Sequence, residues 1–370
     1  MRRRFWPFPL AVMAISVVAA APRSAAPPSP TAQRQKIRQA IARGVAFLRR
    51  SQLPDGSWKQ YPGITALAAL AMVRSGVKPV DPAVTKAAAY LARQAKPNGS
   101  IYTDAFGPAQ ALPNYNTALA MRALHAAGNP SYRALVARAQ QFLAQSQFDE
   151  GEGISRADPR YGGIGYGSRE DNPDLSNLQQ ALEALRETGH PRDSEVFARA
   201  IVFLQRCQNR GESNDQAWAA NDGGFVYAAS GESKADEYTR KPHSSYGSMT
   251  YAGIKSYLYC NVAKSDLRVQ AAYRWIRQTF TVKENPNMRD DGLYYYYHTM
   301  AKTLAILGER VVVDSQGRRR YWAAELAAEL IRRQQRDGAW ANANRRWRED
   351  DKVLVTGYAI LALTYCERGL

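Results

Sequence analysis

Two groups of residues in this sequence could carry chemistry, and both lie at the start of an apolar stretch. Four consecutive tyrosines, Tyr294 to Tyr297, are followed by His298, a residue type that often serves as a general base near neutral pH. Two adjacent carboxylates, Asp350 and Asp351, precede a second apolar stretch. Such acids can transfer a proton, although at a helix start they more commonly interact with the helix dipole.

Aromatic side chains extend the candidate site. Their ring faces suit an isoprenoid chain or a passing carbocation, and they stack equally well on a sugar ring. The side chains that we expect to bind a ligand are Tyr246, Tyr251, Tyr294, Tyr295, Tyr297 and His243. The alternative is that the tyrosine run only packs between helices and that His298 is a structural histidine with a hydrogen-bond partner.

An internal repeat supplies the elements that must position these residues. The segment RGVAFLRRSQLPDGSW, Arg43 to Trp58, ends a helical run with Gln, a polar turn, Gly and Trp. The basic residue, the aromatic-Leu pair and the Gln recur at the same spacing in RAQQFLAQSQ (138–147) and RAIVFLQRCQ (199–208). LIRRQQRDGAW (330–340) repeats the helix end with its turn, and weaker copies occupy 87–102 and 271–280. This regularity indicates stacked units of one kind.

Each copy is followed by a second helical segment that is apolar or small on nearly all faces. These segments begin near Ile64, Tyr115, Leu175, Ser248, Tyr295 and Val353. The first helix of each pair carries charge along one stripe, so we expect the second set to lie inside. The sequence therefore predicts an all-α fold, an α/α toroid of six helical hairpins. Since inner helices run in one direction, the loops before them should meet at one mouth.

The repeated turn is interpreted as a joint between hairpins. Gln at a helix end can satisfy backbone groups that the helix leaves unpaired, and Gly permits a sharp exit. Trp supplies a large packing face for the next hairpin. We therefore expect these residues to hold the ring together and to take no part in catalysis.

The segment from Arg43 to Trp58 resembles the QW motif of squalene and oxidosqualene cyclases. Over residues 34–369 the six hairpins are similar to the toroid of terpenoid cyclases and protein prenyltransferase β subunits. The resemblance implies an isoprenoid-related ligand. Class II cyclases protonate their substrate with an Asp-x-Asp-Asp motif, which this chain lacks; its nearest string is Arg348-Glu349-Asp350-Asp351.

Protein prenyltransferases hold zinc with an Asp-x-Cys pair and a His. His298 falls on the His position of that resemblance, whereas Tyr246 and Ser248 stand at the other two ligand places. We therefore expect no metal and no cofactor, and the resemblance leaves open whether the chain is an enzyme.

The N-terminus predicts export. Three Arg precede an apolar stretch with an Ala19-Ala20-Ala21 cleavage pattern, so residues 1–21 are expected to be a secretory signal, and 22–32 an Ala/Pro/Ser-rich linker ahead of the toroid at 33–370. The destination would be the periplasm or the extracellular medium. Whether the leader is cleaved or remains as an anchor stays open; Pro7 and Pro9 disfavour a stable membrane span.

Charge and cysteine content add little that is specific. The net charge of +17 comes from Arg residues scattered over many helices, which does not indicate nucleic acid binding. Cys207, Cys260 and Cys366 lie far apart within apolar patterns and are expected to be buried small hydrophobes.

Three functions remain open on the sequence. The first is an exported squalene cyclase-like and prenyltransferase-like protein whose aromatic central pocket binds an apolar or isoprenoid small molecule. The second is a polysaccharide lyase or glycoside hydrolase on an α/α toroid, in which a Tyr, His298 and an Arg act on an acidic sugar. The third is a non-catalytic scaffold that binds a protein partner of unknown kind. An apolar closed pocket would favour the first, a polar cleft the second and a filled centre the third.

Overall fold

Six helical hairpins make up the structure, a computed structural model that describes residues 30–167 and 172–370. The outer helices are α1 (Pro30–Ser51), α3 (Pro82–Arg93), α6 (Arg133–Gln145), α8 (Glu195–Arg206), α11 (Leu267–Thr279) and α13 (Trp322–Arg333). The inner helices are α2 (Pro62–Arg74), α5 (Pro113–Ala126), α7 (Leu175–Glu187), α10 (Gly247–Tyr259), α12 (Leu293–Leu307) and α14 (Lys352–Gly369). The predicted all-α toroid is confirmed.

Several short helices and one pair of short strands lie in the loops between these helices. They are α4 (Pro108–Ala111), α9 (Asp236–Thr239), the 3-10 turns Pro130–Tyr132, Glu150–Glu152 and Arg346–Arg348, and the antiparallel pair β1 (Val312–Val313) and β2 (Arg319–Arg320). The loops that lead from an outer to an inner helix are mostly long, and α4 and α9 lie in two of them.

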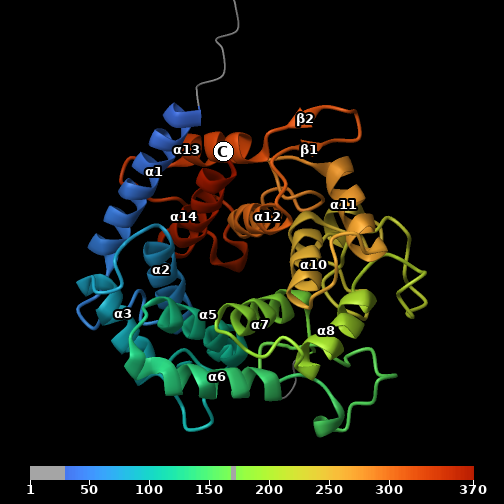
Figure 1. The fold of residues 1–370 in the computed structure, drawn as a ribbon, viewed down its shortest axis with the longest axis horizontal. Helices are drawn as coiled ribbons and strands as arrows, with labels where there is room; N and C mark the ends of the chain where they lie inside the picture. Colours follow the sequence, from blue (N-terminus) through green and yellow to red (C-terminus); the bar gives the residue numbers. More distant parts are fainter. Residues whose placement is uncertain (1–29, 168–171) are drawn as a thin grey trace, which may run out of the picture.

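The inner helices form a closed ring. Each contacts the next in the order α2, α5, α7, α10, α12, α14, and α14 returns to α2. Figure 1 shows this ring from one end, with the outer helices surrounding it. The first and last helices are neighbours as well, because α1 packs on both α13 and α14. The chain therefore closes on itself and does not form an open solenoid.

Side-chain composition explains which helices lie inside. Every residue of α2 from Pro62 to Met72 is buried, as its small and apolar sequence predicts. The outer helix α1 buries only one stripe, with residues three or four apart facing the ring: Ile37, Ala40, Ile41, Gly44 and Leu48. A helix that is apolar all round is stable only when other helices surround it, so the pattern places the two sets.

The repeated Gln and Gly act as joints, as predicted. The Gln52 Nε2 donates to the carbonyl of Gly56 in its own turn, at 2.9 Å, and to that of Ala83 in the next outer helix, at 2.8 Å. Three further glutamines repeat this pair of hydrogen bonds, each to its own turn glycine and to the next outer helix: Gln147 with Gly162 and Val196, Gln208 with Gly223 and Arg268, and Gln334 with Gly338 and Ala40. The last of these joins α13 to α1 and so closes the outer ring.

The turn glycines touch the neighbouring backbone. Gly338 has φ +89°, and a Cβ at this position would lie 2.5 Å from the carbonyl oxygen of Arg43. Gly56, at φ +90°, would meet the carbonyl of Lys86 at 2.4 Å in the same way. Only glycine fits both the left-handed conformation and this close approach.

The two tryptophans of the turns are equivalent. Trp58 and Trp340 are both fully buried, and each indole donates to the backbone carbonyl ten residues earlier, Leu48 at 2.9 Å and Leu330 at 2.7 Å. They fix the turn to the end of its own outer helix. Trp340 also packs on the next hairpin, as expected for a joint, because a Cβ at Gly44 of α1 would lie only 2.9 Å from its ring.

A buried cluster of charges crosses the middle of the ring. Glu183, fully buried on α7, forms ion pairs with Arg122 of α5, Lys255 of α10 and Lys302 of α12. Glu187, one turn further along α7, pairs with Arg122 at 3.0 Å and Lys302 at 2.5 Å. Burial lowers the pKa of Lys255 to about 8, and the neighbouring charge of Lys302 adds to this effect against the attraction of Glu183. The cluster ties four inner helices together.

Other expectations from the sequence have mixed outcomes. The three cysteines are buried and free, as expected for small hydrophobes. The first helix begins at Pro30, slightly before the expected start of the toroid at residue 33. The proposed signal, 1–21, lies outside the described residues. Among the residues that the structure does describe, no helix has the length and apolar character needed to cross a membrane.

Candidate functional site

A cavity of about 310 Å³ opens at the end of the ring where the inner helices begin. All six hairpins contribute to it, through the loops before the inner helices and through their first turns. The predicted meeting of these loops at one mouth is therefore confirmed. Seven tyrosines line the cavity: Tyr61, Tyr115, Tyr166, Tyr227, Tyr246, Tyr295 and Tyr358.

Hydrogen bonds and ring contacts fix the tyrosines of the cavity wall. The hydroxyls of Tyr115 and Tyr358 are 3.0 Å apart, and the ring of Tyr295 meets that of Tyr358 edge to face at 6.0 Å. The Gln179 Nε2 donates to the Tyr295 hydroxyl at 3.1 Å. Burial raises the pKa of all three phenols, so they stay neutral. The wall offers ring faces together with a few neutral hydroxyls.

Glu349 is the one carboxylate among the described residues that line this cavity. Its Oε1 accepts the backbone N–H groups of Tyr294 and Tyr295, both at 2.9 Å, and its Oε2 accepts the Asn342 Nδ2 at 2.8 Å. It thereby caps the start of α12 from the following repeat. Burial raises the pKa of Glu349 to about 7, against the opposing effect of these three donors. The carboxyl can therefore hold a proton at neutral pH.

A second buried acid lies close to the cavity without lining it. Asp174 immediately precedes α7 as its N-cap, and its carboxylate accepts both the backbone N–H and the side-chain amide of Asn177, at 2.8 and 2.7 Å. Burial raises the pKa of Asp174 to about 6. These contacts give Asp174 a structural role as a helix cap.

Basic residues and residues with strained backbone conformations lie at the mouth of the cavity. The Arg348 guanidinium lies 5.4 Å from the centre of the Tyr61 ring, and the Lys234 ammonium lies 4.5 Å from that of Tyr227. Leu112, Trp347 and Arg348 line the cavity with φ between +40° and +60°, a conformation that costs non-glycine residues free energy. Trp347 is 45% exposed, so the cavity reaches the surface beside it.

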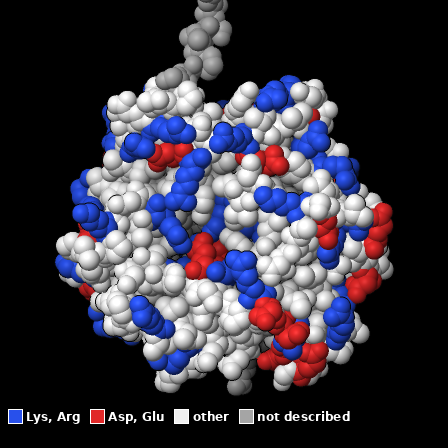
Figure 2. Space-filling view, viewed as in Figure 1, with Lys and Arg blue, Asp and Glu red and all other residues white. Residues whose placement is uncertain are grey.

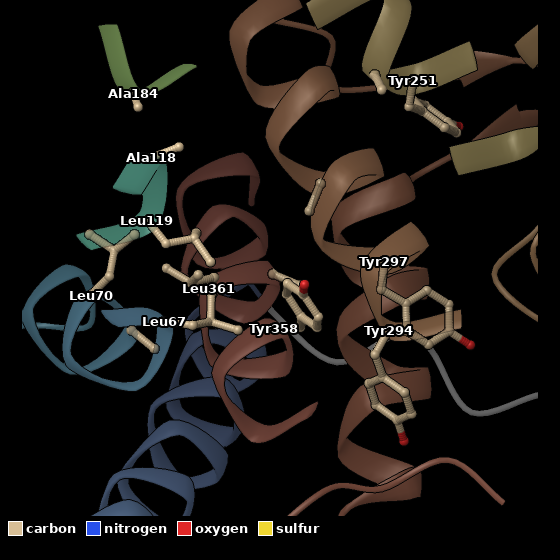
Figure 3. Packing of buried hydrophobic residues seen from close by; sticks show 14 of the residues in the cluster. Leu67, Leu70, Ala118, Leu119, Ala184, Tyr251, Tyr294, Tyr297, Tyr358 and Leu361 are labelled. Atoms are coloured by element: carbon tan, nitrogen blue, oxygen red, sulfur yellow. The ribbon is translucent and has the colours of Figure 1, made fainter. Parts of the chain in front are cut away.

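Two of the six predicted ligand-binding residues, Tyr246 and Tyr295, line the cavity. Tyr294 and Tyr297 pack edge to face against each other, and in Figure 3 they lie side by side, apart from Tyr358. Tyr297 donates to the carbonyl of Val282 in the loop before α12. Both residues therefore fill space between hairpins, the alternative considered for the tyrosine run.

The other predicted ligand-binding residues also lie elsewhere. Tyr251 is buried on α10, where its ring meets Tyr296 edge to face. The His243 ring packs against Trp218, and its Nδ1 is 2.7 Å from the carbonyl oxygen of Gly231. Neither side chain reaches the cavity wall.

His298 lies one layer below the cavity. Its ring stacks on Tyr358, with centroids 5.7 Å apart, and neither ring nitrogen has a hydrogen-bond partner within the described chain. Burial lowers the pKa of His298 well below its ordinary value, so the imidazole is neutral. The wall of tyrosines therefore separates His298 from a ligand in this cavity.

The predicted acids face outward. Asp351 caps α14 by accepting the backbone N–H of Val353 at 2.8 Å, and Asp350 lies beside it in a shallow depression next to Lys59. Capping the start of a helix is the role expected from the sequence as the commoner one for such acids. Over residues 30–167 and 172–370, no cluster of three His, Cys, Asp or Glu side chains is arranged to hold a metal ion.

Sequence reasoning missed three features of the cavity. Glu349 stands in the string Arg348-Glu349-Asp350-Asp351, but nothing in that string reveals which acid turns inward. Tyr61 and Tyr358 lie almost 300 residues apart in the sequence, in segments whose spacing gave no signal that they would line one cavity. The apolar segment from Val353 indicates that Tyr358 is buried in the ring, but it does not indicate that Tyr358 lines the cavity.

Comparisons with known proteins identify the fold. No protein-family profile matches the sequence. The structure superposes on that of the type II terpene cyclase MstE from Scytonema in complex with geranylgeranyl dihydroxybenzoate, with a TM-score of 0.59 and 13% identity, over 92% of this chain and 100% of that one. MstE without ligand gives 0.56 at 14% identity over 91% and 100%, and a protein from Actinoplanes gives 0.53 at 15% over 90% and 100%. The chain has the terpenoid cyclase-like α/α toroid fold.

One curated relative is similar in sequence. The squalene–hopene cyclase of Bradyrhizobium diazoefficiens is 36% identical over 126 residues, which cover 30% of this chain and 19% of that enzyme. The match thus spans about a fifth of the cyclase. It agrees with the resemblance found in the repeated turn.

Proposed function

We propose that this protein is exported and binds an apolar, isoprenoid-type small molecule in the cavity at the mouth of the ring. The observation that carries the proposal is the cavity wall, to which the six hairpins contribute seven tyrosines and one carboxyl group. Ring faces attract hydrocarbon chains and passing cations without demanding a hydrogen bond. The volume of about 310 Å³ is at the lower end of the range for small-molecule sites, which suits one isoprenoid chain.

The shared fold supports the same ligand class. MstE has been solved with geranylgeranyl dihydroxybenzoate and with merosterolic acid A. The cavity of the present chain disfavours glycoside hydrolysis, because that reaction usually requires two carboxyl groups on either side of the scissile bond and Glu349 is alone among the described lining residues. Lyase chemistry through His298 would need that side chain in the cavity, where it does not lie.

A ligand-binding assay with a cavity-filling variant tests the proposal. Ser176 lines the cavity, is half-buried and makes only a 3.4 Å contact with the Tyr295 hydroxyl, so Ser176→Phe should fill the cavity without breaking a strong contact. Geranylgeraniol should stabilise the wild type by about 2.7 kcal/mol when present at a hundred times its Kd. The variant should lose this stabilisation.

The matched control is Ser315→Phe, on the exposed turn between β1 and β2. It should respond to geranylgeraniol as the wild type does. If geranylgeraniol fails to shift the unfolding of any of the three proteins while an acidic oligosaccharide does, the glycan alternative replaces the isoprenoid one. If neither molecule has an effect, the scaffold alternative remains.

A second candidate function is proton-initiated cyclisation, and one observation favours it. Glu349 lines the cavity with its pKa raised to about 7, so a fraction of the protein carries a proton on this group at neutral pH. Proton transfer to an alkene carbon would leave a carbocation, which the tyrosine faces stabilise until a ring closes and another proton is lost. Three donors already engage the carboxyl oxygens, so we expect this activity to be slow.

Product analysis distinguishes binding from cyclisation. Geranylgeraniol incubated with the protein should give a cyclic isomer of unchanged mass if Glu349 acts as the acid. Glu349→Gln should then abolish the isomer, whereas Asp350→Asn, a change of the neighbouring exposed acid, should leave it. Recovery of unchanged geranylgeraniol with the wild type would restrict the function to binding.

Export is tested separately, because its basis is the sequence of residues 1–21 alone. The culture medium or the periplasmic fraction should contain a shortened chain whose N-terminus follows Ala21. Recovery of the full-length chain from the cytosolic fraction alone would refute export.

A further inference from the structure

A second recess lies at the opposite end of the ring, where the inner helices end. It has a volume of about 560 Å³ and is surrounded by the last turns of α2, α7, α10, α12 and α14. In Figure 2 a hollow near the middle of the molecule is bordered by Lys and Arg side chains, with a small acidic patch beside it. The recess and the tyrosine cavity are separated by the buried charge cluster described above.

Positive charge dominates this recess. Five basic side chains line it, Arg74, Arg186, Arg192, Lys302 and Arg368, against one lining carboxylate, Glu187. The excess of positive over negative charge extends into the buried cluster beneath the recess. There the two carboxylates Glu183 and Glu187 form ion pairs with four cationic side chains: Arg74, Arg122, Lys255 and Lys302.

Three of the four arginines around the recess, Arg186, Arg192 and Arg368, are not neutralised by an acid within the described chain, whereas Arg74 pairs with Glu187. Arg186 donates to the amide oxygen of Asn261 at 3.2 Å, and Arg368 lies over the Tyr365 ring. Neither of them, nor Arg192, forms an ion pair with an acid in residues 30–167 and 172–370. Burial lowers the pKa of Arg186, and the charge of Arg192 lowers it further, so the two guanidinium groups repel each other. An anion between them would remove this repulsion.

Helix ends alone do not explain these cations. Arg74, Arg186 and Arg368 stand in the last turns of their helices, where the dipole favours positive charge. Yet their guanidinium groups donate to Glu187 and Asn261, or stack on a ring, and Arg192 comes from the loop after α7. The convergence of four arginines and a buried lysine on one hollow goes beyond dipole compensation.

Lys302 supplies a floor for a ligand. Its side chain is only 4% exposed, and its ammonium forms ion pairs with Glu183 at 2.6 Å and Glu187 at 2.5 Å. An ammonium has three donors, so one remains for a group in the recess. Arginine forks match the geometry of phosphoryl oxygens. Leu258, Ile306 and Leu361 add an apolar wall that would tolerate an organic substituent.

We propose that this recess binds a phosphoryl group, with Lys302 at its floor and Arg74, Arg186, Arg192 and Arg368 around it. The group can come from a free diphosphate or phosphate ester, or from the head of an anionic phospholipid. The site is separate from the tyrosine cavity and does not depend on the function proposed for that cavity.

Calorimetric titration of the full chain with inorganic diphosphate at low ionic strength tests the proposal. The informative variant is Arg192→Gln with Arg368→Gln, because both side chains are exposed and removing them breaks no ion pair of the described chain. The matched control is Arg133→Gln with Arg138→Gln, two exposed arginines on the outer helix α6. Diphosphate should bind the wild type and the control, and the recess variant should bind about tenfold more weakly or worse.

A parallel experiment distinguishes the two sources of the phosphoryl group. Vesicles of phosphatidylcholine with and without phosphatidylglycerol are floated with the same three proteins. Flotation that requires phosphatidylglycerol and is lost in the recess variant supports a lipid headgroup, whereas diphosphate binding without flotation supports a free ligand. The proposal is overturned if neither probe binds the wild type. It is equally overturned if the probes bind all three proteins with the same affinity, since that result reflects general positive charge.

Discussion

Replacing Gly338 by alanine tests whether the joints between hairpins hold the ring closed. Gly338 has φ +89°, and its added Cβ would lie 2.5 Å from the carbonyl oxygen of Arg43 on α1. The left-handed conformation alone costs alanine about 1–2 kcal/mol. Displacing the backbone of α1 adds about 1–3 kcal/mol, the usual cost of overpacking. We expect a total loss of roughly 2–5 kcal/mol in the free energy of unfolding.

The matched control separates these two contributions. Gly189 has φ +85°, nearly the same conformation, but a Cβ there would meet nothing within 4 Å. Gly189→Ala should therefore lose only the conformational part, about 1–2 kcal/mol. Equilibrium urea unfolding, followed by circular dichroism, measures both values under identical conditions.

The difference between the two losses in the free energy of unfolding tests whether the turn presses on α1. If Gly338→Ala loses about 1–3 kcal/mol more than Gly189→Ala, the excess measures the contact between α13 and α1 without the conformational cost. Equal losses, within the error of the extrapolation, would show that the turn does not press on α1. The joint would then be a local turn and would not close the ring.

The buried groups give three further predictions. Trp58→Ala should lower the free energy of unfolding by about 3–5 kcal/mol in urea titrations, and a loss no larger than that of Trp347→Ala at the surface would contradict the role of the joint. Glu183→Gln removes the ion-pair partner of buried Lys255, leaves Lys302 with Glu187 alone and should cost about 3–5 kcal/mol in the free energy of unfolding. Glu212→Gln, which changes an exposed acid, should cost almost nothing, and similar losses for the two variants would refute the stabilising role of the charge cluster. The pKa of Glu349 rises from 4.5 to about 7 on folding, so the stabilisation that this group provides is complete below about pH 4.5 and is lost as the pH rises through about 7. Over this range the free energy of unfolding of the wild type should fall by up to about 3 kcal/mol relative to that of Glu349→Gln. A difference that stays flat or has the opposite sign would disprove the pKa shift.

The sequence was informative where one physical rule acts in several repeats. Gln52 and Gln334 carry out the same task at opposite ends of the chain, so their spacing revealed the joint. The inner helices could be recognised because they are apolar all round, a property that does not depend on knowing their neighbours.

The site was harder to predict because it depends on helix phase. Successive residues of a helix point about 100° apart, so the four tyrosines before His298 cannot share one surface. Tyr295 faces the cavity, while Tyr294 and Tyr297 pack between hairpins. Which of them turns inward is set by how α12 packs on its neighbours, and the run itself does not contain that information.

The charge cluster was invisible for a related reason. Arg122, Glu183, Lys255 and Lys302 stand on four different helices and are far apart in the sequence. In the sequence, each of these residues appears as a single charge within an apolar segment. A charge in that position usually lies at the edge of the buried face of a helix. Only the closed ring brings them together. The same holds for Glu349, whose two backbone donors, Tyr294 and Tyr295, come from the preceding repeat.

The closed ring also means that the place where the chain starts and ends within the cycle of hairpins is, in physical terms, arbitrary. Helix α1 packs against α13 and α14, and the Arg34 side chain donates to the backbone carbonyl of Glu367 near the other end of the described chain. A gene rearranged so that a short linker joins residue 370 to residue 30, and so that translation starts at the turn after α7, would encode the same set of contacts. Such a circular permutant should fold into the same toroid, with its new ends at the periphery of a ring that has no structural beginning.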